Sequence, residues 1–176
     1  MQEGSLPPRL DTLPPPPAGL SGWPWTQAPE PMPATRPDGR PWPCITVVTP
    51  SLNQAQFLEE TLRSVLLQGY PALDYIVMDG GSQDGSCEII KRYAPWLAHW
   101  QSQPDGGQAA AVGAGLERAR GAVFNFINSD DSLLPGTLAA VGAALAPGKA
   151  AALAGAVIDR SPEGDRLFEP CDLSLE

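Results

Sequence analysis

The chain has 176 residues, 43% of them apolar and 18% charged, enough for one domain with a sizeable core and too few for two. Its 20 acidic and 11 basic residues give a net charge of −9 without any basic run, which excludes nucleic acid as a partner. The N-terminus has neither the basic patch nor the apolar core of a secretory signal, and no apolar run is long enough to span a membrane. We therefore expect a cytoplasmic protein with no transmembrane segment.

Residues 1–43 differ in composition from the rest, because they hold 13 of the 21 prolines. Proline cannot donate a backbone hydrogen bond, so this segment is predicted to be an extended, disordered tail or linker. Trp23, Trp25 and Trp42 could pack back onto the domain or recognise a partner, and we favour a loosely packed tail. The folded domain is then expected to comprise residues 44–176.

Two repeats of strand, polar loop and helix are predicted from residue 44 onward. The β-branched run 44–50 is typical of a buried parallel strand, and Asn53 with Gln56 reads as a capping box that opens an amphipathic helix. A second apolar run, 73–79, ends in a polar glycine-rich loop and is followed by a weaker helical stripe that stops before Pro95.

A third helix is predicted over residues 108–120, after a short strand at 96–101. Its buried face is expected to carry Val112, Leu116 and Ala119. Gly113 and Gly115 inside it each cost roughly 1 kcal/mol relative to alanine, so something other than helix propensity must account for them.

The remaining pattern continues the alternation. The apolar run 122–128 is expected to be a central strand, 137–145 a helix, and 151–159 a strand that enters a turn. Strands that alternate with helices at this spacing require right-handed crossovers and a parallel sheet covered on both faces. The fold class is therefore α/β, a Rossmann-like sandwich with a mainly parallel sheet.

Polar residues follow the apolar runs, where a parallel α/β sheet binds its ligand. Thr49, Pro50 and Ser51 follow the first run, and acidic loops begin at Asp79, Asp105 and Asn128. The adjacent Asp130 and Asp131 repel each other unless a cation lies between them, and magnesium or manganese bridging to a diphosphate fits such oxygen ligands. Taken singly, each aspartate could instead be a turn residue.

Four of these segments, in this order, resemble the motifs of family 2 glycosyltransferases. They are ITVVTPSLNQAQFLEETLRSVLLQGYP, DYIVMDGGSQDGS, PDGGQ and NSDD, and the resemblance covers residues 43–168. It implies that the chain contains the nucleotide-sugar-binding half of a GT-A fold. The implied partners are a nucleotide-sugar donor, with a pyrimidine base favoured, and a glycan or lipid-linked glycan acceptor.

The resemblance also implies roles for individual residues. Asp79 would bind the base, Asp105 would lie near the ribose or the sugar, and Asn128 occupies the first acidic position of the family's DxD motif. The divalent metal, manganese or magnesium, would then be held by Asp130 and Asp131, and would stabilise the diphosphate leaving group. The expected nucleotide-sugar-binding residues are Thr49, Pro50, Ser51, Asp79, Gly81, Asp105, Gln108, Ser129 and Asp130.

Some positions depart from the family pattern. Gly113 replaces an expected asparagine, Ala156 replaces an expected aspartate, and no residue can be assigned as the general base that an inverting transferase needs. That base would belong to an acceptor-side motif, and the chain is expected to stop short of it at Glu176.

The sequence leaves three functions open. The first is a transferring donor domain, and the second is an inactive or fragmentary relative that binds a nucleotide sugar or a protein. The third is another doubly wound protein, which is disfavoured because no G-x-G-x-x-G or P-loop motif occurs.

Overall fold

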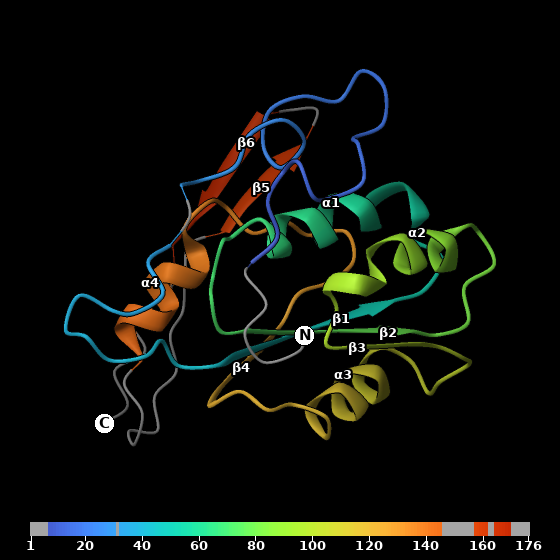
Figure 1. Cartoon of the computed structure of the whole chain (residues 1–176). Coiled ribbons are helices and arrows are strands. Elements are labelled where there is room, and N and C mark those ends of the chain that lie inside the picture. The colour runs from blue at the N-terminus through green and yellow to red at the C-terminus, as the bar shows by residue number, and fades with distance from the viewer. Residues whose placement is uncertain (1–6, 31, 146–156, 162–163, 170–176) are drawn as a thin grey trace.

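The computed structural model describes residues 7–30, 32–145, 157–161 and 164–169. Its main body is a four-stranded parallel sheet in the order β3-β2-β1-β4, with helices on both faces (Figure 1). This confirms the α/β fold class. The strands are β1 (Ile45–Ser51), β2 (Leu73–Asp79), β3 (His99–Ser102) and β4 (Val123–Phe126). The helices are α1 (Ala55–Leu66), α2 (Ser86–Tyr93), the 3-10 turn η1 (Ala94–Trp96), α3 (Gln108–Leu116) and α4 (Thr137–Ala144).

The centre of the sheet is buried along its whole length. Every residue of β1 and β2 is buried, as expected for strands covered on both faces. Alternate residues face two separate clusters. One cluster packs Val47 and Val77 against α1 and α2, and the other packs Val48 and Met78 against α3 on the opposite face.

The predicted capping box at the start of α1 is wrong. The residue before the helix is Gln54, and Asn53 has a positive φ of 53°. The loop after β2 supplies the partners instead: the Asp84 carboxylate accepts a 2.8 Å hydrogen bond from the Ala55 amide, and the Ser86 hydroxyl accepts one of 3.2 Å from Gln54. The helix start is therefore satisfied by a segment some thirty residues away in sequence, where a local pattern cannot reveal it.

The buried face of α3 differs from the predicted one. Ala111 and Gly115 are its buried residues, while Leu116 is 53% exposed. A Cβ at Gly115 would lie 2.6 Å from Val48 Cγ1, whereas a Cβ at Gly113 would meet nothing within 4 Å. Close approach of α3 to the sheet therefore accounts for Gly115, and no such contact accounts for Gly113.

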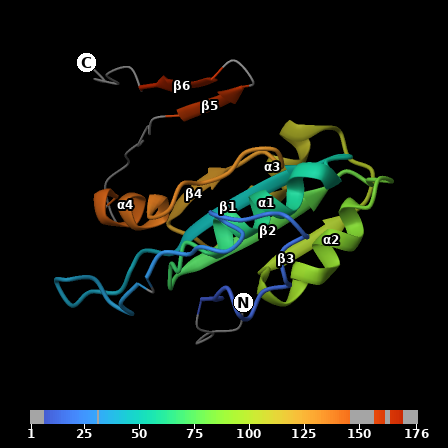
Figure 2. The same cartoon turned by 90° about the horizontal axis from the view of Figure 1, so that it is seen from above.

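In the C-terminal part, the expected central strand 122–128 is at the edge of the sheet, and only part of the expected strand 151–159 is described. Within the part of the chain that the structure describes, β4 is an edge strand and not a central one, with Phe126 44% exposed. β5 (Val157–Ser161) and β6 (Gly164–Phe168) form an antiparallel hairpin that stands apart from the main sheet (Figure 2). This agrees with a strand that enters a turn, and residues 151–156 of that strand lie outside the described residues.

The N-terminal segment is not the loosely packed tail that we favoured. Within its described residues, 7–30 and 32–43, Leu13 and Trp25 are 6% and 8% exposed and Leu13 belongs to the main core cluster. The guanidinium of Arg63, on α1, is fully buried and donates to the backbone carbonyls of Pro14, Pro24 and Trp25. Proline carbonyls remain good acceptors even where the ring removes the donor, so a proline-rich segment can be bound by a buried cation.

Candidate functional site

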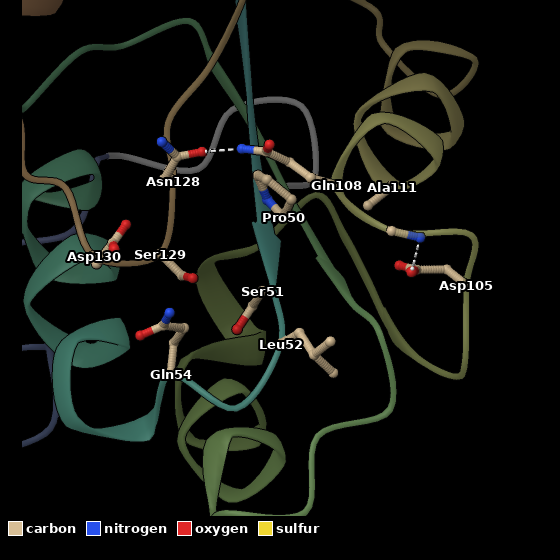
Figure 3. A pocket seen from close by; sticks show the side chains of 11 residues that line it. Pro50, Ser51, Leu52, Gln54, Asp105, Gln108, Ala111, Asn128, Ser129 and Asp130 are labelled. Carbon is tan, nitrogen blue, oxygen red and sulfur yellow. Dashed lines mark hydrogen bonds between the residues drawn. The ribbon is translucent and has the colours of Figure 1, made fainter.

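A cavity of about 310 Å³ lies at the carboxyl ends of β1 and β4, beside the first turn of α3 (Figure 3). This is the edge at which a parallel α/β sheet binds its ligands. Residues from the loops after β1 and β4, from the loop before α3 and from α3 itself line it. They are Pro50, Ser51, Leu52, Gln54, Asp105, Gly107, Gln108, Ala111, Asn128, Ser129 and Asp130.

Ser51, the last residue of β1, carries an unsatisfied polar group into this cavity. The residue is 6% exposed, and its Oγ is buried with no hydrogen-bond partner in the described part of the chain. A buried hydroxyl without a partner costs free energy, and native proteins keep few of them. Ser51 therefore brings an unpaired hydroxyl to the wall of the cavity.

Asp79, predicted to bind a base, lies beside the cavity and does not line it. The β1–β2 register places it next to Ser51, yet its carboxylate accepts hydrogen bonds from within the protein: the amides of Gly81 and Ser82, and the hydroxyls of Ser82 and Ser102. With a side chain 1% exposed, Asp79 organises the glycine-rich loop. A buried carboxylate that shapes a turn also follows a strand, so this position has a structural role besides the predicted contact with a base, which stays a prediction.

Thr49 and Gly81 are also outside the lining. The Thr49 hydroxyl is buried and shares a 2.9 Å hydrogen bond with the Tyr75 hydroxyl, and burial raises the pKa of Tyr75. Gly81 has a φ of +88°, and a Cβ there would lie 3.1 Å from the Pro104 nitrogen. Both residues therefore support the walls of the site and do not contact its interior.

Asp105 lines the cavity from the loop that leads into α3. Its Oδ1 accepts a 2.7 Å hydrogen bond from the Gly107 amide, and it sits so close to Gly80 that a Cβ on that glycine would be 3.3 Å away. Gly107 precedes the first turn of α3 and has a φ of +97°, a conformation that favours glycine. The N-terminus of α3 thus opens on the cavity, where it favours negative charge.

The loop after β4 is joined to α3 by a short chain of side-chain hydrogen bonds. Gln108 donates from Nε2 to Asn128 Oδ1, and Asn128 donates from Nδ2 to Asp131 Oδ2 at 3.0 Å. Asp130 lines the cavity with an exposed side chain, and Asp131 is exposed beside it without lining it. The predicted lining residues Pro50, Ser51, Asp105, Gln108, Ser129 and Asp130 are therefore brought together.

Sequence reasoning missed four residues that line the cavity: Leu52, Gln54, Gly107 and Ala111. Leu52 and Gln54 belong to the first motif and follow Ser51 directly, and Ala111 lies one helical turn after Gln108. The turn that follows β1 and the helical period would have indicated them. Ala156, where the family pattern has an aspartate, lies outside the described residues.

The family comparison agrees with this geometry. Residues 46–170 match the family description Glycosyl transferase family 2, which is well over half of the chain. The chain belongs to glycosyltransferase family 2. The match begins after the N-terminal segment, so residues 1–45 lie outside the family domain.

Relatives of this family 2 chain include an uncharacterized glycosyltransferase of Mycobacterium tuberculosis, 36% identical over 136 residues, which are 76% of this chain and 52% of the relative. The chain therefore spans about half the length of that relative. No helix among the described residues is both long and apolar enough to cross a membrane.

Solved structures show the same fold. The mannosyltransferase PcManGT of Pyrobaculum calidifontis, in complex with GDP-Man and Mn²⁺, matches with a TM-score of 0.54 and 30% identity over 61% of this chain and 36% of that chain. Staphylococcus aureus TarS 1–349, in complex with UDP-GlcNAc, matches with a TM-score of 0.52 and 26% identity over 57% of this chain and 30% of that one. These likenesses confirm the GT-A class of fold for the family 2 domain.

The donor set of the family 2 site fits a hard cation that keeps much of its water. Among the described residues no three histidine, cysteine or acidic side chains gather into a ligand cluster. Asp130 lines the cavity and Asp131 is exposed beside it, so the loop offers two carboxylates. Magnesium and manganese are commonly bound in this way, by one or two carboxylates together with waters and substrate phosphates. The residues present therefore fit a metal that is completed by a diphosphate.

Proposed function

We propose that this chain is the donor-binding domain of a glycosyltransferase, which binds a nucleoside-diphosphate sugar with a divalent cation and presents the sugar for transfer to an acceptor hydroxyl. The observation that carries the proposal is the cavity at the sheet's carboxyl edge, which is lined by Ser51, whose buried hydroxyl has no partner among the described residues. Its walls combine a helix N-terminus, hydrogen-bonding side chains and the Asp130 carboxylate, as a phosphate ester with a metal requires.

The charge of the protein supports a metal-dependent donor site. A net charge of −9 disfavours a diphosphate unless positive charge is supplied locally. No lysine or arginine among the described residues lines the cavity, so the proposal takes the positive charge from the N-terminus of α3 and from a cation held by Asp130 and Asp131. When bound, that cation would neutralise the diphosphate and stabilise it as the leaving group.

Individual residues take complementary roles in this proposal. Ser51 and Asp105 would bind the nucleoside part from opposite walls of the cavity, and Gln108 with Asn128 would hold the metal-binding loop in place. Asp79, Thr49 and Gly81 would act on the donor only by shaping the loop and strand beneath it. The bound nucleotides in the two similar structures support this class of ligand without specifying the base.

A second function, a nucleotide-sugar-binding module without transfer, is favoured by one observation. Among the described residues, the carboxylates that line the cavity are Asp105 and Asp130. This proposal assigns Asp130 to the metal and Asp105 to the nucleoside, so neither is assigned to deprotonate an acceptor.

The test is calorimetric titration of the full chain with UDP and with GDP, each in Mn²⁺ and in EDTA. We expect micromolar to millimolar binding of at least one nucleotide that weakens at least tenfold in EDTA. Asp130→Asn combined with Asp131→Asn should reduce binding in Mn²⁺ to the EDTA level. Asp11→Asn removes another exposed carboxylate, from outside the cavity, and should leave binding unchanged.

Product analysis separates the two functions. Release of free sugar from a UDP- or GDP-sugar in Mn²⁺, abolished by the double variant, supports a transferring domain, whereas binding without turnover supports the binding module. Nucleotide binding that is equal in Mn²⁺ and EDTA would overturn the metal assignment. Absence of any nucleotide binding would overturn the donor site itself.

A further inference from the structure

The loop that carries Asp130 and Asp131 continues as an irregular segment that one face of α1 holds. The Thr61 hydroxyl donates to the Asp131 carbonyl at 2.7 Å, and the Ser64 hydroxyl accepts from the Leu133 amide at 3.1 Å. One turn later, Gln68 donates from Nε2 to the Leu134 carbonyl at 3.0 Å. Irregular backbone needs partners for its polar groups, and here two side chains of α1 and that of Gln68, just after its end, supply them.

The N-terminal segment adds a further bond to the same loop. Trp23 donates a 2.8 Å hydrogen bond from Nε1 to the carbonyl oxygen of Leu133, across 110 residues of sequence. The amide of Leu133 is bound by Ser64, so both backbone polar groups of this residue are fixed from outside the loop. Leu133 is only two residues from Asp131 in the chain.

Trp23 is itself held in place by the helix that holds the loop. Arg63 donates from Nε to the carbonyl of Pro24 at 3.1 Å and from Nη2 to that of Trp25 at 3.0 Å, the two residues that follow Trp23. Because Arg63 adjoins Ser64 on α1, one turn of helix binds both the N-terminal segment and the loop. Trp23 also joins the N-terminal segment to the loop directly, through its hydrogen bond to Leu133.

We propose that Trp23 is a positioning residue of the metal- and donor-binding loop, so that the N-terminal segment forms part of the donor site although it lies outside the family domain. The inference rests on the proposed function, because it assigns the Asp130–Asp131 loop to the metal. Exposed carboxylates bind a metal well only when the backbone beneath them is fixed. Trp23 contributes to that fixation and contacts no ligand.

The test replaces Trp23 by phenylalanine, which keeps an aromatic ring and removes the indole donor. Trp42→Phe is the matched control, because Trp42 lies in the same segment and its Nε1 donates to the carbonyl of Pro33, within that segment. We expect Trp23→Phe to weaken UDP binding in Mn²⁺ by about 2- to 10-fold, the effect of one partly buried hydrogen bond. UDP binding in EDTA should change by less than twofold, and Trp42→Phe should change neither.

A second measurement does not depend on any ligand. Hydrogen exchange in the free chain should be faster for residues 129–136 in Trp23→Phe, and unchanged there in Trp42→Phe. Unchanged exchange in Trp23→Phe, or faster exchange with unaltered Mn²⁺-dependent binding, would overturn the positioning role. An equal loss of UDP binding in Mn²⁺ and in EDTA would also overturn the positioning role, because it would indicate a general destabilisation of the chain. Failure of the proposed function is recognised separately, since the unsubstituted chain would then bind neither UDP nor GDP.

Discussion

Arg63 Nη1 donates a 2.8 Å hydrogen bond to the carbonyl oxygen of Pro14, joining helix α1 to a residue 49 positions earlier in the chain. The same guanidinium reaches Pro24, Trp25 and the Tyr93 hydroxyl, and lies 5.4 Å from the centre of the Trp25 ring. Arg63 reaches the nearest carboxylate of this network, Glu59, only through Tyr93. The Tyr93 hydroxyl accepts a hydrogen bond from Arg63 and donates one of 2.9 Å to Glu59. A fully buried cation is thus satisfied mainly by carbonyl dipoles, with a charge network behind it.

We predict that Arg63→Met strongly destabilises the chain. The substitution keeps the apolar stem but leaves three backbone carbonyls without their donor, which should lower the free energy of unfolding by about 2–4 kcal/mol. Arg63→Lys should recover only part of this loss, since one ammonium cannot span three carbonyls. Urea unfolding provides the measurement.

The control for this prediction is Arg92→Lys. Arg92 pairs with the same Glu59 at 2.9 Å, but its side chain is 51% exposed. Exposed ion pairs contribute roughly 0–1 kcal/mol, so this change should cost far less than Arg63→Met. Equal effects of the two substitutions would show that the N-terminal segment is not bound through Arg63.

The two glycines inside α3 should respond oppositely to alanine. Gly115→Ala places a Cβ within 2.6 Å of Val48 and should destabilise by about 1–3 kcal/mol, because α3 must move away from the sheet. Gly113→Ala meets open space, and should stabilise by up to about 1 kcal/mol through helix propensity. Thermal unfolding of the two variants side by side measures the difference, and a stable Gly115→Ala chain would refute the close packing.

Ser51→Ala should separate binding from stability. The Ser51 hydroxyl has no partner in the free protein, so its removal should leave the free energy of unfolding unchanged or raise it slightly. Affinity for the bound nucleotide should fall by about 2- to 10-fold, if the ligand satisfies this hydroxyl. Calorimetry and urea unfolding on the same variant measure both quantities.

Ser64→Ala is the matched comparison. Its hydroxyl is satisfied inside the protein, by the Thr61 carbonyl and the Leu133 amide, so this variant should lose stability. A Ser51→Ala variant that loses stability in the same way, with no loss of nucleotide affinity, would mean that the hydroxyl serves the fold and not the ligand.

Asp74 should contribute to stability in a pH-dependent way. Burial acts to raise its pKa, but hydrogen bonds from the backbone and guanidinium of Arg120 and from the Thr46 hydroxyl, with the charge of Arg120, bring the pKa below its usual value. A carboxyl whose pKa is lower in the folded state stabilises above its unfolded pKa, near 4, and loses that contribution as the pH falls through the folded value.

Asp74→Asn should therefore lower the free energy of unfolding by about 1–3 kcal/mol at pH 7, since Asp74 is buried while Arg120 is 61% exposed. The difference between the two proteins should shrink below about pH 4. Urea titrations between pH 2.5 and 8 provide the measurement, and a difference that stays constant over this range would contradict the role of the ionised carboxylate.

Much of the fold and the position of the site were predictable from the sequence alone. Strand-like runs that alternate with helical stripes determine a parallel α/β sheet, and polar loops directly after 44–50 and 122–128 place the site at its carboxyl edge. Six of the predicted site residues line one cavity for this reason: parallel strands end at the same edge, whichever residues lie between them.

Only the tertiary structure decided how each polar side chain is used. Asp79 and Ser51 end neighbouring strands, yet the Asp79 carboxylate accepts four hydrogen bonds from within the protein, whereas the Ser51 hydroxyl has no partner among the described residues. The partner that starts α1, Asp84, and the cation that binds the N-terminal segment, Arg63, act across 29 and up to 49 residues. Periodicity and local motifs report on near neighbours in sequence, whereas hydrogen-bond partners are chosen by proximity in space, which exists only once the chain has folded.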